Sequence, residues 1–189
     1  MPSSPFSSAV FRHVAAFLLA FALPLLAIFT WWGGFNEVDI QTGEAGPYTY
    51  AYMEKQGDYS KLTDLVSEVE KELQAQKIEA GLPVTVLLDN PELVDVGQRR
   101  GRIGFLIPAG SVVSPPLRME TVPVRPVLIA RVHAGSLLAP GMAYAALDTY
   151  QQARGQGVIM PTLEIYRAAP VRTQIGEMTV EMPLNAAQN

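Results

Sequence analysis

The carboxylate of Glu164 is the side chain in this sequence best placed to do chemistry. It lies in the run Pro161-Thr-Leu-Glu-Ile-Tyr-Arg, flanked by Leu163 and Ile165, where the pattern indicates a β-strand. Burying a lone carboxylate costs several kcal/mol unless it is paired or used. Glu164 could therefore bind a cationic ligand or, if the protein is an enzyme, act as a general base. The alternative is that Glu164 and Tyr166, which share a strand face, lie on a solvated side of the sheet.

Tyrosines are the second candidate group. Tyr48, Tyr50 and Tyr52 stand at alternate positions and share one face of a predicted strand. Aromatic faces attract cations by about 0.5–2 kcal/mol, so these rings and Tyr166 could form the walls of a groove around Glu164. Packing against the helices would explain the same spacing. The predicted ligand-binding residues are thus Glu164, Tyr166, Tyr48, Tyr50 and Tyr52.

Other chemistry is excluded by what the sequence lacks. There is no cysteine, and His13 and His133 are the only histidines, so thiolate sites, disulfides and histidine cages for metals cannot form. No Gly-x-Ser-x-Gly elbow or phosphate-binding glycine loop is present. The sequence predicts neither a metal nor a cofactor.

Charge argues against nucleic acid as a partner. The net charge is −4, and Arg99, Arg100 and Arg102 form the nearest approach to a basic cluster. Binding to phosphates needs a larger basic surface, so these arginines indicate a solvated strand edge.

Residues 14–32 form an uncharged run of 19 residues, just long enough as a helix to cross a bilayer core of about 30 Å. We expect a cytoplasmic tail at 1–13, a transmembrane helix at 14–32 and contact with the lipid bilayer. A cleaved signal peptide is the alternative, but the run ends in bulky residues, Ile-Phe-Thr-Trp-Trp, where a peptidase needs small ones.

Orientation follows from the flanking charges. Arg12 precedes the span, and no lysine or arginine follows it until Lys55. The positive-inside rule then places the N-terminus in the cytoplasm and the domain outside, which in a bacterium is a single-pass inner-membrane protein with a periplasmic domain.

Two similar halves follow an expected linker at 33–46. In each half, a strand and a helix lead to two further strands, and the spacing from Gly57 to Pro83 equals that from Gly135 to Pro161, 26 residues. The predicted fold is α+β: residues 47–189 form two pseudo-symmetric β-α-β-β units, a mixed or antiparallel sheet and two helices on one face. The other face would be an open groove, and Glu164 would take the place of Val86, each being third after a proline.

Three segments near the C-terminus resemble the signature of a known family. Pro161–Arg167, Val171–Ile175 and Met178–Leu184 are similar to the C-terminal motifs of GyrI-like domains, also called bacterial transcription activator effector-binding domains, of the SOUL superfamily. With Asp89-Asn90-Pro91, Ala146–Tyr150 and the N-terminal span, the chain looks most like the membrane-anchored GyrI-like type that serves as a receptor in autophagy of the endoplasmic reticulum.

The resemblance implies a groove for a small amphipathic or cationic molecule, with Glu164 at its centre. It leaves three functions open: non-enzymatic binding, hydrolysis of electrophilic cyclopropanoid-type toxins through Glu164, or a scaffold with a vestigial groove. The chain has no helix-turn-helix for a transcription role, and it ends at Asn189 without the receptor type's long tail. His133 alone is a poor basis for haem binding. The oligomeric state stays open.

Overall fold

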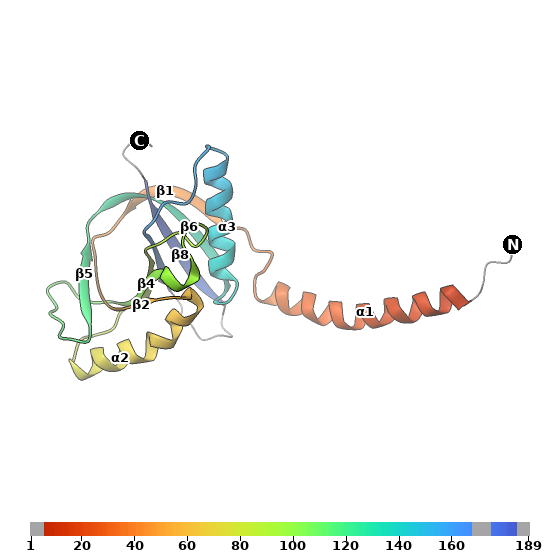
Figure 1. Ribbon diagram of the computed structural model, residues 1–189, viewed down its shortest axis with the longest axis horizontal. Coiled ribbons are helices and arrows are strands. Elements are labelled where there is room, and N and C mark those ends of the chain that lie inside the picture. Colours follow the sequence, from red (N-terminus) through yellow and green to blue (C-terminus); the bar gives the residue numbers. More distant parts are fainter. Residues whose placement is uncertain (1–5, 168–174, 185–189) are drawn as a thin grey trace.

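The computed structural model describes residues 6–167 and 175–184, which form one long helix and an α+β domain (Figure 1). The Ala168–Pro170 turn and most of the Val171–Ile175 motif lie outside the described residues. The elements in chain order are α1 (Phe6–Trp31), β1 (Asp39–Ala45), β2 (Tyr48–Gln56), a 3-10 segment η1 (Tyr59–Leu65), α2 (Val66–Ala75), β3 (Pro83–Leu87), η2 (Val96–Gln98), β4 (Arg100–Leu106), β5 (Arg118–Val122), β6 (Arg125–Gly135), α3 (Ala139–Gln152), β7 (Thr162–Tyr166) and β8 (Ile175–Pro183).

The strands make one antiparallel sheet of eight in the order β1-β6-β8-β7-β3-β4-β2-β5. The unit β2-α2-β3-β4 recurs as β6-α3-β7-β8, and β3 and β7 meet at the centre. This confirms the α+β class and the repeated β-α-β-β unit. The sheet is antiparallel, which is one of the two sheet types that the sequence allowed.

Each repeat carries one more strand than predicted. Residues 39–45, assigned above to the linker, form β1, and β5 was not predicted. Both are short and mostly exposed, so they lack the apolar alternation that marks a half-buried strand. Each pairs with the other repeat: β1 with β6, and β5 with β2.

These exchanged strands belong to one continuous two-stranded ribbon. The same register holds from Asp39 opposite Arg131 to Tyr52 opposite Arg118, and the pairing is interrupted at a bend formed by residues 46–47 and 123–124. In Figure 1 the ribbon forms the arch that runs from β1 to β5. Gly46 has φ +101°, and a Cβ there would lie 2.6 Å from the carbonyl oxygen of Pro123, so the close approach requires glycine.

Both helices cover the same face of the sheet, as predicted. α2 packs over β2 and β4, where Val69 and Leu73 meet Phe105, whereas α3 packs over β6 and β8 through Ala143 and Leu147. The helix predicted in the first repeat is divided into two parts: the 3-10 segment η1 comes first, and α2 begins at Val66. The Asp58 carboxylate caps η1 by accepting a hydrogen bond from the Ser60 amide at 2.9 Å.

The face away from the helices is not an open groove. Its side chains pack together beneath the arch, and most are buried: Tyr50, Tyr52, Val84, Val86, Leu163 and Ile165. The expected groove on this face is therefore wrong, because the exchanged strands, which the sequence pattern did not show, curl the sheet around it.

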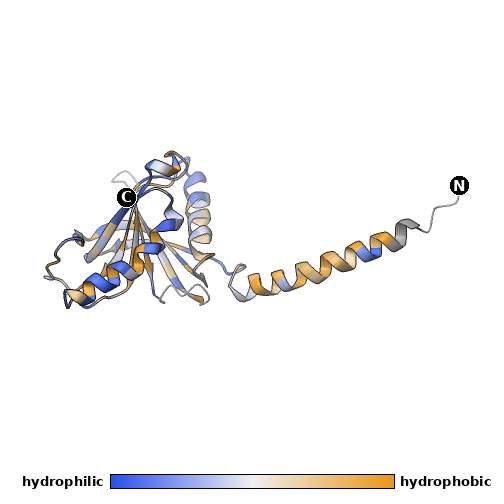
Figure 2. Cartoon of the chain, turned by 60° about the horizontal axis from the view of Figure 1, so that its bottom comes forward, coloured by the Kyte–Doolittle hydropathy of each residue, from blue (hydrophilic) through white to orange (hydrophobic). Residues whose placement is uncertain are grey.

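α1 extends away from the domain, with Pro24 inside it (Figure 1). Within it, Val10–Trp31 is long and apolar enough to cross a membrane, with a mean hydropathy of 2.3 and none of that window buried. Figure 2 shows the hydrophobic colouring along nearly its whole length.

Candidate functional site

Glu164 is buried on the helix-covered face of the sheet. The residue is 4% exposed, although its strand β7 is central. Its Oε1 accepts a hydrogen bond from the Tyr144 hydroxyl at 3.0 Å, and its Oε2 accepts one from the Tyr166 hydroxyl at 2.6 Å. The solvated alternative for Glu164 is therefore excluded by its burial.

The register explains why a carboxylate occurs at this point. Glu164 is paired with Thr85 of β3, and Leu163 with Val86. Counting from the prolines aligned Glu164 with Val86, and this alignment is wrong because the two side chains lie on opposite faces of the sheet; the cross-strand partner of Glu164 is Thr85. Since neighbouring residues of a strand face opposite sides, Val86 points under the arch, whereas Thr85 and Glu164 point toward the helices.

Central strands β3 and β7 lie between the two helices, because α2 packs over β2 and β4 and α3 over β6 and β8. Tyr144 of α3 closes this space. It packs against α3's own core and against the cluster of Leu62, Leu87 and Ile103, while its hydroxyl lies 2.6 Å from that of Thr162. Tyr144 thus bridges both repeats above Glu164.

Tyr144 was missed by the sequence reasoning. The helical spacing does place it with Leu147 and Gln151, at i, i+3 and i+7, on the face that is buried. That signal identifies an inward-facing tyrosine on α3 but not its contact with a strand 20 residues later.

Burial dominates the electrostatics of the cluster. It raises the pKa of Glu164, although the hydrogen bonds from Tyr166 and Tyr144 lower it in part. Burial, with the nearby carboxylate, also raises the pKa values of Tyr144 and Tyr166 well above their usual range, so both hydroxyls stay protonated donors. Among the residues the structure describes, no lysine, arginine or histidine forms an ion pair with Glu164.

Tyr48, Tyr50 and Tyr52 are not brought to Glu164, because they lie on the face beneath the arch. Tyr48 donates to Oε1 of Glu181, a second buried carboxylate, at 2.9 Å. Arg125 donates to the other oxygen of Glu181 at 3.2 Å. The sheet therefore carries one buried carboxylate on each face, and only Glu181 has a cationic partner among the described residues.

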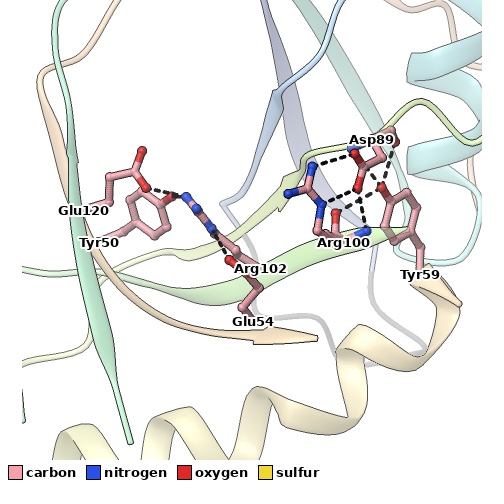
Figure 3. A network of polar contacts seen from close by, with 7 residues as sticks. All are labelled: Tyr50, Glu54, Tyr59, Asp89, Arg100, Arg102 and Glu120. Atoms are coloured by element: carbon pink, nitrogen blue, oxygen red, sulfur yellow. Dashed lines mark hydrogen bonds and ion pairs between the residues drawn. The ribbon is translucent and has the colours of Figure 1, made fainter. Parts of the chain in front are cut away.

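Arg102 contacts the other two tyrosines, and Figure 3 shows its hydrogen bond to Tyr50. Its guanidinium donates to the Tyr50 hydroxyl at 3.1 Å, lies 4.6 Å from the centre of the Tyr52 ring and forms ion pairs with Glu54 and Glu120. Burial raises the pKa of Tyr50 to about 12. These rings are therefore engaged in packing and charge pairing under the arch.

The neighbouring arginines also have structural partners. Arg100 forms an ion pair with Asp89 at 2.8 Å, and the Tyr59 hydroxyl donates to the Asp89 carbonyl at 2.7 Å (Figure 3). Arg99 donates to the carbonyl of Val94 at 2.8 Å. Of the two arginines that form ion pairs, Arg100 is largely exposed and Arg102 is mostly buried. Because all three arginines already have partners, they do not form the free basic surface that phosphates require. In the described part of the chain, no cluster of three or more potential metal ligands occurs either.

No protein-family model matches the sequence, and no curated protein sequence does. Solved structures do match the fold. The C-terminal domain of EcmrR superposes with a TM-score of 0.61 at 11% identity, covering 78% of this chain and 98% of that one. SAV2435 bound to tetraphenylphosphonium gives 0.56 at 8% identity, covering 79% and 96%. A hydrolase encoded by lin2189 from Listeria innocua gives 0.54 at 9%, covering 84% and 98%. At these identities the likeness shows the fold alone.

Proposed function

We propose that this protein is a membrane-anchored binding domain for a lipophilic or amphipathic cation, with Glu164 as the charged centre of its site. The observation that carries the proposal is the contrast between the two buried carboxylates. Among the described residues, Glu181 is paired with Arg125, whereas Glu164 is contacted by the hydroxyls of Tyr144 and Tyr166 and by no cation. A cationic ligand would supply the charge partner that the described residues do not provide for Glu164.

The surroundings suit a cation that is also apolar. The site lies between two helices and contains the rings of Tyr144 and Tyr166, which can face a cation as well as donate to the carboxylate. Because Glu164 is only 4% exposed, the ligand must displace a covering group. Tyr144 is the group to move, since it reaches the carboxylate from α3 rather than from the sheet itself.

Similarity to other proteins supports the same class of ligand. The sequence resembles GyrI-like domains, whose motif glutamate maps onto Glu164. SAV2435, a protein of the same fold, is bound to tetraphenylphosphonium, a large lipophilic cation, in its solved structure. We infer the class of ligand from this comparison and not its identity.

We also propose that α1 anchors the domain in a membrane with the N-terminal tail in the cytoplasm. The 22-residue apolar window supports the anchor, and Arg12 at its N-terminal side supports the orientation. A lipophilic cation that partitions into the bilayer would then be concentrated next to its binding domain.

A hydrolase is the second candidate, because a buried glutamate with a raised pKa beside two tyrosine hydroxyls could act as a general base. A protein of similar fold, encoded by lin2189 from Listeria innocua, is described as a hydrolase. Both oxygens of Glu164 already accept hydrogen bonds from tyrosine hydroxyls, so neither oxygen is free to orient an attacking water molecule. We therefore place binding ahead of catalysis, and a scaffold role last.

Titration of the full chain in lipid nanodiscs with tetraphenylphosphonium tests the proposal, with empty nanodiscs subtracted. We expect Glu164→Gln to weaken binding at least tenfold, about 1.4 kcal/mol, because it removes the charge and keeps the shape. The matched control is Glu177→Gln, a half-buried carboxylate on β8 that is paired with Arg131 and Arg167, and this variant should bind like the wild type. Equal affinity in all three proteins would reject Glu164 as the site. Turnover of an electrophilic substrate that is lost in Glu164→Gln would move the assignment to the hydrolase.

A further inference from the structure

The C-terminal end of α1 is fixed to the domain rather than joined through a loose linker. The Gly135 amide donates to the carbonyl of Trp32 at 2.8 Å, and the Asn36 side chain donates to the carbonyl of His133 at 2.6 Å. Gly33 is so close to β6 that a Cβ there would lie 2.8 Å from the His133 carbonyl oxygen. The helix and the end of β6 therefore share one small, hydrogen-bonded junction.

The turn that ends α1 sends the chain back along the helix. The Gly34 amide bonds the carbonyl of Phe29 at 2.9 Å and the Gly33 amide bonds that of Thr30 at 3.0 Å, with φ +76° at Gly33, the pattern of a Schellman cap. As a result, the ring of Phe35 packs edge-on against Phe29, with centroids 5.0 Å apart. Phe35 thus lies at the depth of the last turns of α1 although it follows the helix in sequence.

Large apolar side chains are exposed around this junction. Trp31 is 78% exposed, Phe35 is 66% exposed, and Leu137, in the β6–α3 turn two residues after Gly135, is 62% exposed. Aromatic and apolar side chains at the end of a membrane helix are typical of the boundary between headgroups and acyl chains. The nearby cations are already engaged: Arg131 and Arg167 both form ion pairs with Glu177, at 3.6 and 2.9 Å.

We propose that the β6–α3 turn, through Leu137, and the returning Phe35 rest on the membrane interface, so that the domain sits on the lipid surface in one orientation. The inference rests on the anchoring role proposed for α1. Its occupant is the lipid of the leaflet in which α1 ends, because the same hydrogen bonds that hold Trp32 hold the turn that carries Leu137. The contact is apolar, so it does not depend on anionic lipids.

The absence of cysteine from the sequence makes a direct test simple. Single cysteines replace Leu25 in α1, Leu137 in the turn and Val112 in the β4–β5 loop, all three exposed. That loop adjoins β5, on the side of the domain away from α1 (Figure 1). Each full-length variant carries an environment-sensitive fluorophore and is reconstituted in neutral phosphatidylcholine vesicles containing spin-labelled lipid.

We expect the probe at Leu137 to be blue-shifted and quenched severalfold more strongly by headgroup-proximal spin labels than the probe at Val112. Deep acyl-chain labels should quench the probe at Leu25. Adding phosphatidylserine should leave the Leu137 signal unchanged. If Leu25 is quenched but Leu137 behaves like Val112, the domain stands clear of the membrane and this inference fails while the anchor stands. If Leu25 is not quenched, the anchoring proposal fails, and this inference with it.

Discussion

Thr85 and Glu164 are register partners at the centre of the sheet, so the two repeats place a hydroxyl and a carboxylate side by side on the helix-covered face. The repeated fold does not require that one of these paired residues be threonine and the other glutamate. The first repeat fills its position with a small polar group, and the second with a carboxylate that needs two tyrosine donors. The asymmetry at one register pair is what distinguishes a candidate binding centre from a repeated packing position.

The first prediction concerns stability and pH. Burial raises the folded-state pKa of Glu164 above its unfolded value, so the folded protein binds the proton more tightly. Stability is then highest below the unfolded pKa and falls as the pH rises through the raised one. Glu164→Gln removes this loss, so we expect the variant to match the wild type near pH 4 and to exceed it at neutral pH, by on the order of 1 kcal/mol. Urea unfolding in detergent micelles at both pH values measures the difference, and a less stable variant at neutral pH would contradict it.

The second prediction separates stability from affinity at Tyr144. Tyr144→Phe removes a hydroxyl that donates to Glu164 and contacts Thr162. The loss of a hydrogen bond to a buried charge should cost about 1–3 kcal/mol at neutral pH. Because that hydroxyl also competes with the ligand for the carboxylate, affinity for a lipophilic cation should rise severalfold.

Tyr150→Phe is the control. Tyr150 lies on the same helix, and the guanidinium carbon of Arg154 lies 3.5 Å from the centre of the Tyr150 ring. It should change neither unfolding nor binding appreciably. A weaker cation affinity in Tyr144→Phe would mean that the tyrosine contributes to the ligand's contacts instead of covering the site.

The third prediction tests the pairing beneath the arch. Arg125→Met leaves Glu181, which is 3% exposed, without its cationic partner. Breaking a buried pair costs about 3–5 kcal/mol, and because the Arg125 side chain is 20% exposed we expect about 2–4 kcal/mol. The loss should shrink at low pH, where Glu181 is protonated. Arg131→Met on the same strand breaks a more exposed pair with Glu177 and should cost less than about 1 kcal/mol. Equal losses in thermal unfolding would show that burial does not distinguish these pairs.

Local patterns in the sequence predicted much of the fold. They did not predict the strand register, which decides which side chains lie next to one another. The helix predicted in the first half occurs as η1 and α2, because the apolar face formed by Leu62, Leu65, Val69 and Leu73 must be buried whatever it packs against. The alternation at Leu163 and Ile165 likewise predicts which side chains share a face. Counting from prolines could not align Glu164 with Thr85, because a slip of one residue moves every side chain to the other face.

The exchanged strands and the cover of the site are non-local features. β1 and β5 are polar and mostly exposed, and they are ordered by pairing with a strand of the other repeat. Tyr144 reaches Glu164 only because α3 packs over β8 and β6. Neither relationship leaves a periodic signal within its own segment, so the sequence did not show that the face away from the helices is filled or that Tyr144 covers Glu164.

The fourth prediction concerns the bend of the arch. Replacing Gly46, at the bend, with alanine should lower the free energy of unfolding, whereas replacing Gly43, within β1 of the same ribbon, should not. Gly46→Ala places a Cβ 2.6 Å from the Pro123 carbonyl oxygen at a residue with φ +101°, so it should destabilise the domain by about 2 kcal/mol or more. At Gly43, in β1, the nearest atom to a new Cβ is the Ile129 Cδ1 at 3.7 Å, which is ordinary contact. Gly43→Ala should therefore be neutral or stabilise by up to about 1 kcal/mol, because alanine loses less backbone entropy in a strand. Thermal unfolding followed by circular dichroism compares the two, and a harmless Gly46→Ala would show that the ribbon can open at its bend without loosening the sheet that holds Glu164.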